Sequence, residues 1–293
     1  MRDVLFKIGP ISIHSYGLFI AIGVLFAFIV GMYRAKRKGL DSEFVFDVGF
    51  YSGIMGIVCT RLLFYIVEIP AIIKDPSILW DFQYGYVVYG GIIGGVLTGL
   101  FYCKKKKKRF MDYFDIVMPS IVLAQAFGRI GCFMTGCCYG KQTESAFSIV
   151  YHNSQMAPNE VKLLPTQLMS SAGDFLIYFI LILYAKRSKK SGQVGAMYLI
   201  LYSIGRFFIE FFRDDYRGSI GFLSTSQAIS ILIVLVGVIL FVIATPKTEE
   251  KNQQVLEESS KELASEDEEA DQEEDSSEDE VEVVVLHHED EGK

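Results

Sequence analysis

The sequence predicts an all-α integral membrane protein with seven membrane-spanning helices, and three observations lead to this fold class. Of the 293 residues, 51% are hydrophobic and only 22% are charged. The apolar residues are gathered in runs that approach the roughly 20 residues a helix needs to cross a bilayer. Clusters of lysine and arginine separate alternate runs, as is typical of loops on one side of a membrane.

The seven apolar runs fix where the helices are expected. They lie near residues 14–33, 46–67, 85–103, 113–132, 166–185, 194–212 and 226–245. No small-residue cleavage site follows the first run, so we expect it to be retained as a span rather than removed as a signal peptide. The connection 139–165 is the longest loop on its side and is expected to be functional or to carry structure of its own.

The C-terminal segment differs from the rest in charge. Residues 249–293 contain 20 Asp and Glu against 3 Lys, a net charge of −17, so a chain of net charge −7 leaves +10 on the preceding residues. An acidic segment without aromatic residues remains solvated and disordered. We therefore predict a membrane domain over residues 1–246 and a disordered acidic tail over 247–293.

The basic residues predict the orientation of the helices. Clusters follow the first, third and fifth runs, at Arg34, Lys36, Arg37 and Lys38, at 104–109, and at Lys186, Arg187, Lys189 and Lys190. The opposite loops are sparse in lysine and arginine. The positive-inside rule then places the N-terminus outside and the tail in the cytoplasm. We interpret the run 104–109 as an anchor on anionic membrane lipids rather than a nucleic-acid site.

Polar residues within five of the runs fall at one depth. They are Arg129, Arg61, Arg206, Tyr89 and His14. Each is 15 to 23 positions from the basic cluster of its own run, or roughly 22–35 Å at 1.5 Å per residue. Against a hydrocarbon core of about 30 Å, all five are expected in its outer half or at its outer edge. This predicts one pocket open to the outer leaflet, since a conduit would place polar residues at every depth.

The sixth run indicates what the pocket binds. Tyr202, Arg206, Glu210 and Arg213 are spaced so that they share one helix face, and Glu210 can pair with Arg206. A structural ion pair is the alternative interpretation of these two residues alone. Together with Arg129, they leave an excess of positive charge, which favours an anion. The planar guanidinium suits phosphate, so a phospholipid headgroup is the expected ligand.

The five cysteines show no disulfide framework. Cys132, Cys137 and Cys138 lack the paired CxxC spacing that is typical of a zinc site. We expect small buried thiols and no metal or cofactor.

Seven short motifs follow one another along the chain. The most distinctive extends from Gly128-Arg129-Ile130-Gly131 through Gly136 to Gly140. The others are His14-Ser15-Tyr16-Gly17, Arg61-Leu62-Leu63-Phe64-Tyr65, Gly90-Gly91-Ile92-Ile93-Gly94, Pro165-Thr166-Gln167-Leu168, the run from Tyr202 to Arg213, and the run from Gly221 to Gln227. These motifs resemble those of the bacterial phosphatidylglycerol–prolipoprotein diacylglyceryl transferases, and the first is similar to the family's signature. The resemblance extends from about residue 10 to 245 in the same order.

The resemblance implies transfer of the diacylglyceryl group of phosphatidylglycerol to the lipobox cysteine of a prolipoprotein signal peptide. A thioether forms and glycerol phosphate is released at the outer leaflet of the bacterial inner membrane. Arg129 and Arg206 would bind the phosphate, Glu210 would orient Arg206, and Tyr16 and Tyr202 would donate hydrogen bonds. The remaining expected substrate-binding residues are Arg61, His14, Gly128, Gly136 and Gly140.

Some residues depart from the family pattern. Tyr89 stands where the family has a histidine that has been proposed as the base, Cys132 and Thr135 replace asparagines, and Cys137 replaces a glutamate. Either the arginines activate the thiol without that histidine, with Tyr89 taking a catalytic role, or the chain is a divergent paralogue. Tyr89 as an interfacial anchor is the further alternative. A transporter or flippase for anionic lipids and a non-catalytic lipid or prolipoprotein binder are the competing functions.

Overall fold

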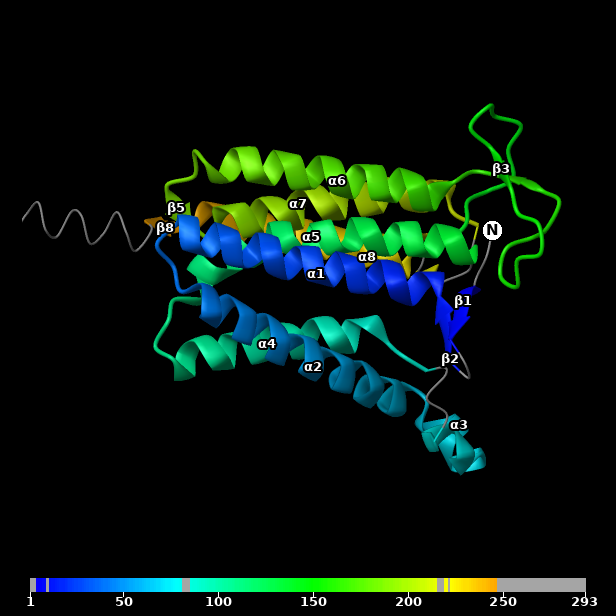
Figure 1. Ribbon diagram of the computed structural model, residues 1–293, viewed down its shortest axis with the longest axis horizontal. Helices are drawn as coiled ribbons and strands as arrows, with labels where there is room; N and C mark the ends of the chain where they lie inside the picture. The colour runs from blue at the N-terminus through cyan, green and yellow to red at the C-terminus, as the bar shows by residue number, and fades with distance from the viewer. Residues whose placement is uncertain (1–3, 9–10, 81–84, 215–218, 221, 247–293) are drawn as a thin grey trace, which may run out of the picture. The chain divides into compact units, whose positions relative to one another are not determined.

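Long helices dominate the computed structural model, which describes residues 4–8, 11–80, 85–214, 219–220 and 222–246. In this part of the chain seven helices have 17 to 26 residues (Figure 1): α1 Ser15–Arg37, α2 Ser42–Val67, α4 Val88–Lys105, α5 Phe110–Thr135, α6 Thr166–Ala185, α7 Gln193–Ile209 and α8 Thr225–Val242. The short elements are β1 Val4–Ile8, β2 Ile11–His14, α3 Ile69–Lys74, η1 Pro76–Trp80, β3 Ile149–Val150, β4 Lys162–Leu163, β5 Lys190–Ser191, η2 Glu210–Phe212, β6 Ser219–Ile220, β7 Leu223–Ser224 and β8 Thr245–Pro246.

The predicted spans agree with the long helices to within four residues at each end. Among the described residues, six helices are long and apolar enough to cross a membrane: α1, α2, α5, α6, α8 and α7 together with η2. The predicted span 85–103 coincides with α4, which is as long as α8 but contains five glycines and ends in two lysines. The glycines and lysines lower the mean hydropathy of α4, so α4 is not among the six. The predicted tail 247–293 lies outside the described residues.

Helix α5 is the centre of the membrane domain and packs against α1, α6 and α7. In the apolar 18-residue stretch of α5, 44% of the residues are buried, against 6% in the corresponding stretch of α2. Helices α2 and α4 pack mainly on each other and form a hairpin beside the bundle of α1, α5, α6, α7 and α8 (Figure 1). The exposed side chains of the long helices are largely apolar, which is expected of a surface that faces lipid.

The three basic loops lie at one end of the domain. Arg34 donates from Nη1 to the carbonyl oxygen of Ile116 at 2.6 Å, which joins the end of α1 to the start of α5. Asp115 accepts hydrogen bonds from the backbone amides of Gly192 and Gly195 at 2.9 and 2.8 Å, which joins α5 to the start of α7. Arg34 belongs to the first basic cluster, and it is buried because its guanidinium donates to the carbonyl oxygens of Ile116 and Asp115.

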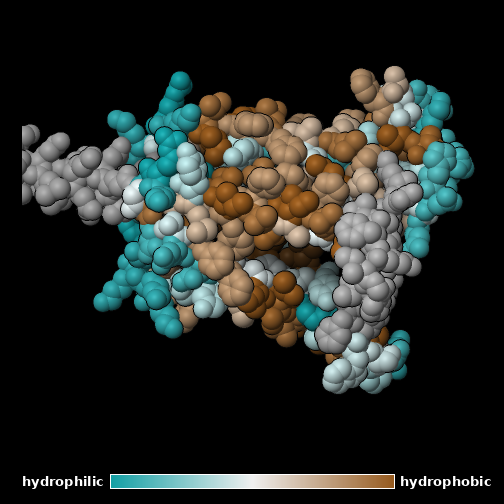
Figure 2. Space-filling view, in the orientation of Figure 1, coloured by the Kyte–Doolittle hydropathy of each residue, from teal (hydrophilic) through white to brown (hydrophobic). Residues whose placement is uncertain are grey.

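An apolar cluster fastens the α2–α4 hairpin to the bundle at this same end. Its members are Ala35, Phe44, Val45, Val48, Cys103, Tyr113 and Ile116. About midway along the helices the surface is hollowed between α1 and the hairpin, among apolar residues (Figure 2). The apolar cluster therefore attaches the hairpin to the bundle at the basic end.

The connection from α5 to α6 has a small core of its own. Tyr151, Ala157 and Leu163 are buried against one another, and β3 pairs with β4 in antiparallel register. Gln167, near the start of α6, donates from Nε2 to the carbonyl oxygen of Cys137 at 2.7 Å and to Tyr151 Oη at 3.1 Å. The expectation that this loop carries structure is confirmed, and it covers the end of α5.

Candidate functional site

Two buried arginines define the candidate site. Arg129 lies six residues before the end of α5 and Arg206 three residues before the end of α7, both at the end opposite the basic loops. At 1.5 Å per residue these positions are about 9 and 5 Å from the helix ends. Their guanidinium groups interact electrostatically with each other. The structure therefore brings together two of the three arginines that the sequence predicts at one depth.

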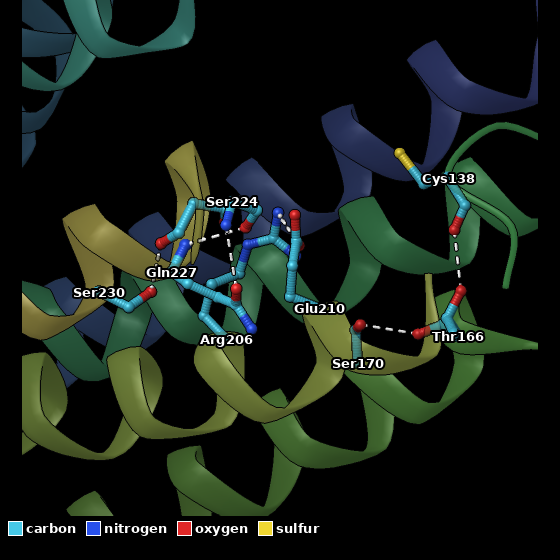
Figure 3. Close-up of polar contacts among 9 residues, drawn as sticks. Cys138, Thr166, Ser170, Arg206, Glu210, Ser224, Gln227 and Ser230 are labelled. Carbon is cyan, nitrogen blue, oxygen red and sulfur yellow. Dashed lines mark hydrogen bonds and ion pairs between the residues drawn. The ribbon is translucent and has the colours of Figure 1, made fainter. Parts of the chain in front are cut away.

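Arg206 is held by the acidic residue that the sequence pairs with it. Its Nη2 lies 3.1 Å from Glu210 Oε2, and the two side chains are only 14% and 8% exposed (Figure 3). Because η2 follows α7 without a break, the spacing of four residues keeps both groups on one face. Arg206 Nη1 is buried and has no hydrogen-bond partner among the described residues. One donor group of this guanidinium is therefore open to an acceptor.

Arg129 is the less constrained of the two arginines. Among the residues that the structure describes, its guanidinium has electrostatic neighbours but no hydrogen-bond or ion-pair partner. The neighbours include Tyr202 and Asp174. Guanidinium donors in a partly buried place need acceptors, and a carboxylate or phosphate oxygen is the strongest.

Asp174 is a site residue that sequence reasoning missed. It lies eight residues into α6, is 5% exposed, and its Oδ2 has no hydrogen-bond partner in the described part of the chain. It interacts electrostatically with both Arg129 and Arg206. An acidic residue inside an apolar run is itself a signal, since charged groups within membrane helices are rare and usually functional.

Two tyrosines predicted in the site lie beside the arginines. Tyr202 interacts electrostatically with Arg129 and Arg206, and its ring stacks on Tyr198 at a centroid distance of 5.5 Å. Tyr16, in the first turn of α1, is an electrostatic neighbour of Arg129 and is 43% exposed. Five helical segments thus contribute to one polar cluster: α1, α5, α6, α7 and η2.

Arg61 has different surroundings from those of the other two arginines. It is buried on α2 and donates to the carbonyl oxygens of Gly85 and Ile78, both at 3.1 Å, and from Nε to Tyr65 Oη at 2.9 Å. The guanidinium also lies over three aromatic rings. These contacts favour a role in holding the connection between α2 and α4, and its role in substrate binding stays a prediction.

Tyr89 and His14 lie at the same end of the domain but have no contact with Arg129 or Arg206 that the structure identifies. Tyr89 is in the first turn of α4 and is 42% exposed, and His14 is an exposed residue at the start of α1. Helix α4 belongs to the hairpin, on the far side of the hollow in Figure 2. The base role of Tyr89 and the binding role of His14 stay predictions.

The three glycines expected to bind substrate have different structural roles. Gly136 ends α5 in the left-handed conformation, with φ of +80°, and its amide donates to the carbonyl oxygen of Cys132 at 3.0 Å. A Cβ on Gly140 would lie 2.7 Å from the carbonyl oxygen of Leu164 and 2.8 Å from that of Phe212. A Cβ on Gly128 would meet no atom within 4 Å. Of the three glycines, only Gly128 has open space at its Cβ position.

The structure brings three cysteines together at the end of α5. The sulfur atoms of Cys132, Cys137 and Cys138 all lie within 4.8 Å of one another. The Arg213 guanidinium is an electrostatic neighbour of Cys138. The spacing of the cysteines in the sequence did not predict this cluster. It forms because the chain turns at Gly136 and brings Cys137 and Cys138 back towards Cys132.

Comparisons with known proteins identify the family of this chain. A family profile described as prolipoprotein diacylglyceryl transferase matches residues 3–243. The phosphatidylglycerol–prolipoprotein diacylglyceryl transferase of Clostridium tetani is 44% identical over 241 residues, which cover 82% of this chain and 97% of the relative. The Clostridium perfringens protein named phosphatidylglycerol–prolipoprotein diacylglyceryl transferase 2 is 42% identical over 243 residues, which cover 82% of this chain and 94% of the relative. The phosphatidylglycerol–prolipoprotein diacylglyceryl transferase of Finegoldia magna is 38% identical over 242 residues, which cover 82% of this chain and 94% of the relative.

Proposed function

The chain belongs to the prolipoprotein diacylglyceryl transferase family, and we propose that it transfers the diacylglyceryl group of phosphatidylglycerol to a prolipoprotein. The acceptor is the thiol of the lipobox cysteine in the signal peptide. Its sulfur attacks the glyceryl carbon that carries the phosphate, a thioether forms, and glycerol phosphate leaves. The open guanidinium donors of Arg129 and Arg206 are the observation that carries this proposal.

The first role of the two arginines is to bind the phosphodiester of the lipid. Arg206 Nη1 lacks an acceptor, and Arg129 lacks a hydrogen-bond partner in the described chain. A phosphate oxygen between the two guanidinium groups supplies an acceptor for each of them, and two charge-assisted hydrogen bonds form. Glu210 holds Arg206 at 3.1 Å, and Asp174 lies within electrostatic reach of both guanidinium groups. These carboxylates orient the arginines before the lipid arrives.

The second role is to stabilise the leaving group. As the carbon–oxygen bond breaks, the phosphate gains a second negative charge, and preorganised cations next to it lower the barrier. Tyr202 interacts with both arginines and is well placed to donate a hydrogen bond to the same oxygens. Tyr16 and the space beside Gly128 border Arg129, where the glycerol part of the headgroup would lie.

The cationic site also favours the thiolate form of the incoming cysteine, since opposite charge lowers the pKa of a thiol. This account needs no histidine at position 89. Tyr89 then acts either as the base or as an aromatic anchor at the membrane interface, and the variant Tyr89→Phe separates the two roles.

The membrane arrangement follows from the basic loops. With these loops in the cytoplasm, the site opens to the outer leaflet of the inner membrane, and the hollow beside α1 gives a lipid a lateral route to it (Figure 2). Helix α4 acts as the seventh span, because its partner α2 needs an apolar neighbour along most of its length. The acidic tail over 247–293 is then cytoplasmic.

Reconstitution into liposomes that contain phosphatidylglycerol tests the proposal. The substrate is a signal-peptide fragment with a lipobox cysteine, and the readout is the mass gain of one diacylglyceryl group on that peptide. We expect the gain with wild-type protein and none with a cysteine-to-serine peptide. Arg129→Gln should lower the rate at least about 100-fold, as expected for loss of a main charge-stabilising donor. The matched control Arg37→Gln, at the exposed end of α1, should retain the rate. No mass gain with the wild-type protein contradicts the proposal.

A further inference from the structure

The three-cysteine cluster at the end of α5 carries an inference beyond phosphate binding. Cys132 is buried in the last turn of the helix, while Cys137 and Cys138 are partly exposed in the loop that follows. Their sulfur atoms lie within 4.8 Å of one another, and none of the three forms a disulfide bond with another described cysteine. In a tetrahedral zinc site with zinc–sulfur bonds of about 2.3 Å, sulfur atoms are roughly 3.8 Å apart. The upper limit of 4.8 Å in this cluster is about 1 Å above that spacing.

The backbone around the cluster is fixed by its neighbours. Gly136 reverses the chain after α5, and Cys138 has a positive φ of 61°, which is uncommon for a residue with a side chain. Gln167 Nε2 donates to the carbonyl oxygen of Cys137 at 2.7 Å, and Thr166 Oγ1 to that of Cys138 at 2.9 Å. Figure 3 shows the carbonyl of Cys138 turned towards Thr166 and its sulfur on the opposite side. The sulfur atoms are thus held together before any ligand binds.

We propose that Cys132, Cys137 and Cys138 bind one thiol-preferring divalent metal ion of the zinc class and leave a fourth coordination position for an incoming thiol. Three thiolates are soft ligands that select zinc over magnesium or calcium. Three protein ligands with one open position are the pattern of catalytic rather than structural zinc sites. No other His, Cys, Asp or Glu of the described residues joins the cluster as a fourth ligand.

The surroundings offset the charge of such a site. Three thiolates on a divalent ion carry a net charge of −1. The Arg213 and Arg129 guanidinium groups are electrostatic neighbours of Cys138, and Arg129 is also a neighbour of Cys132. Arg213 is itself buried, and the backbone at Gly140 bridges to it. The metal site would lie directly beside the proposed phosphate site.

The identity of the incoming thiol rests on the proposed function, in which it is the cysteine of the prolipoprotein. On coordination the thiol releases its proton to solvent, because a metal-bound thiol is deprotonated. Its sulfur uses an electron pair to form the bond to the glyceryl carbon, and the carbon–oxygen bond electrons leave with the phosphate. The neutral thioether then dissociates from the ion. This step supplies thiolate in a chain that has Tyr89 where a histidine base is expected.

Metal content tests the site without reference to the reaction. Protein purified in detergent under anaerobic, reducing conditions is expected to retain about one zinc per chain by elemental analysis. Replacement by Co²⁺ should give the intense sulfur-to-cobalt absorption and the tetrahedral bands of a thiolate site. Cys137→Ser should lose metal, whereas Cys103→Ser, at the other end of the domain, should keep it. Absence of bound metal and of cobalt bands in reduced wild-type protein overturns the proposal, and so does a 2 Da mass loss that marks a disulfide.

A second measurement tests the open position and separates it from the proposed function. Addition of the lipobox peptide to the Co²⁺ protein, without phosphatidylglycerol, should shift the cobalt bands, and the serine peptide should not. An unchanged spectrum with bound cobalt overturns the open position. If the spectrum shifts but lipid addition gives no mass gain, the metal site holds and the transferase assignment fails. If Cys137→Ser lacks metal and modifies peptide at the wild-type rate, the transferase assignment holds and the metal has no catalytic role.

Discussion

The variant Glu210→Gln tests how the candidate site holds its arginines. Arg206 Nη2 and Glu210 Oε2 are 3.1 Å apart, and both side chains are largely buried. At that distance, with an effective dielectric constant of 20, the attraction between unit charges is about 5 kcal/mol. Removing one partner of a buried pair costs about 3–5 kcal/mol, because the remaining charge is left uncompensated. The substitution should lower the midpoint of thermal unfolding on the order of 10 °C.

The assay is thermal unfolding of the purified protein in a neutral detergent, followed by the loss of the monodisperse peak in size-exclusion chromatography. Glu144→Gln is the matched control, since Glu144 pairs with Lys162 at 2.9 Å but the side chains are 79% and 54% exposed. Such an exposed pair contributes only about 0–1 kcal/mol. The control should therefore unfold within a few degrees of the wild type.

Phosphatidylglycerol adds a further test of the same substitution. An anionic phosphate beside Arg206 replaces part of the charge that Glu210 supplied, so the destabilisation should shrink when the lipid is added to the detergent. A neutral diacyl lipid should not have this effect. Equal unfolding midpoints for Glu210→Gln and Glu144→Gln would refute the reasoning about the buried pair. An equal loss of stability with both lipids would refute the placement of a phosphate at Arg206.

Four further substitutions test the fold, two near the site and two at the opposite, basic end. Gly140→Ala should destabilise the protein by about 1–3 kcal/mol, because the new Cβ meets two backbone oxygens. Gly128→Ala, in contrast, should leave the unfolding midpoint unchanged and slow lipid transfer. Equal unfolding midpoints for the two variants would show that the steric argument is wrong. Asp115→Asn should cost about 1–3 kcal/mol in the same assay, since the amide replaces one acceptor oxygen for the two backbone amides at the start of α7, and an unaltered midpoint would contradict it. Asp41→Ala removes the side chain that accepts from the amide of Phe44 at the start of α2 and should cost about 1 kcal/mol; a loss above 3 kcal/mol would indicate a role beyond capping.

The helices of this fold could be predicted from the sequence because each depends on local properties. Length, apolar composition and flanking basic residues placed all seven within four residues of the observed bounds. The position of Arg129 and Arg206 at the end opposite the basic loops could also be predicted, because the rise of a helix is fixed and both are counted from clusters on their own helices.

The parts that could not be predicted depend on how helices pair. Arg61 was expected in the same pocket as the other two arginines, but α2 packs on α4 rather than on α5, so the Arg61 donors bind the carbonyl oxygens of the segment between α2 and α4. The cysteine cluster depends on a left-handed turn at Gly136, which no spacing rule for metal ligands describes. Asp174 was missed although an acidic residue inside an apolar run is a signal in itself; its proximity to Arg129 and Arg206 depends on the packing of α6 against α5 and α7.

The selectivity for phosphatidylglycerol over a neutral diacyl lipid with the same chains tests the central claim most directly. Native mass spectrometry of the protein with both lipids present gives the ratio of bound forms. We predict a clear preference for phosphatidylglycerol in the wild type and in the control Arg37→Gln, and at least a tenfold smaller preference in Arg129→Gln and Arg206→Gln. An undiminished preference in both of these variants would contradict the claim that the two arginines hold the lipid phosphate.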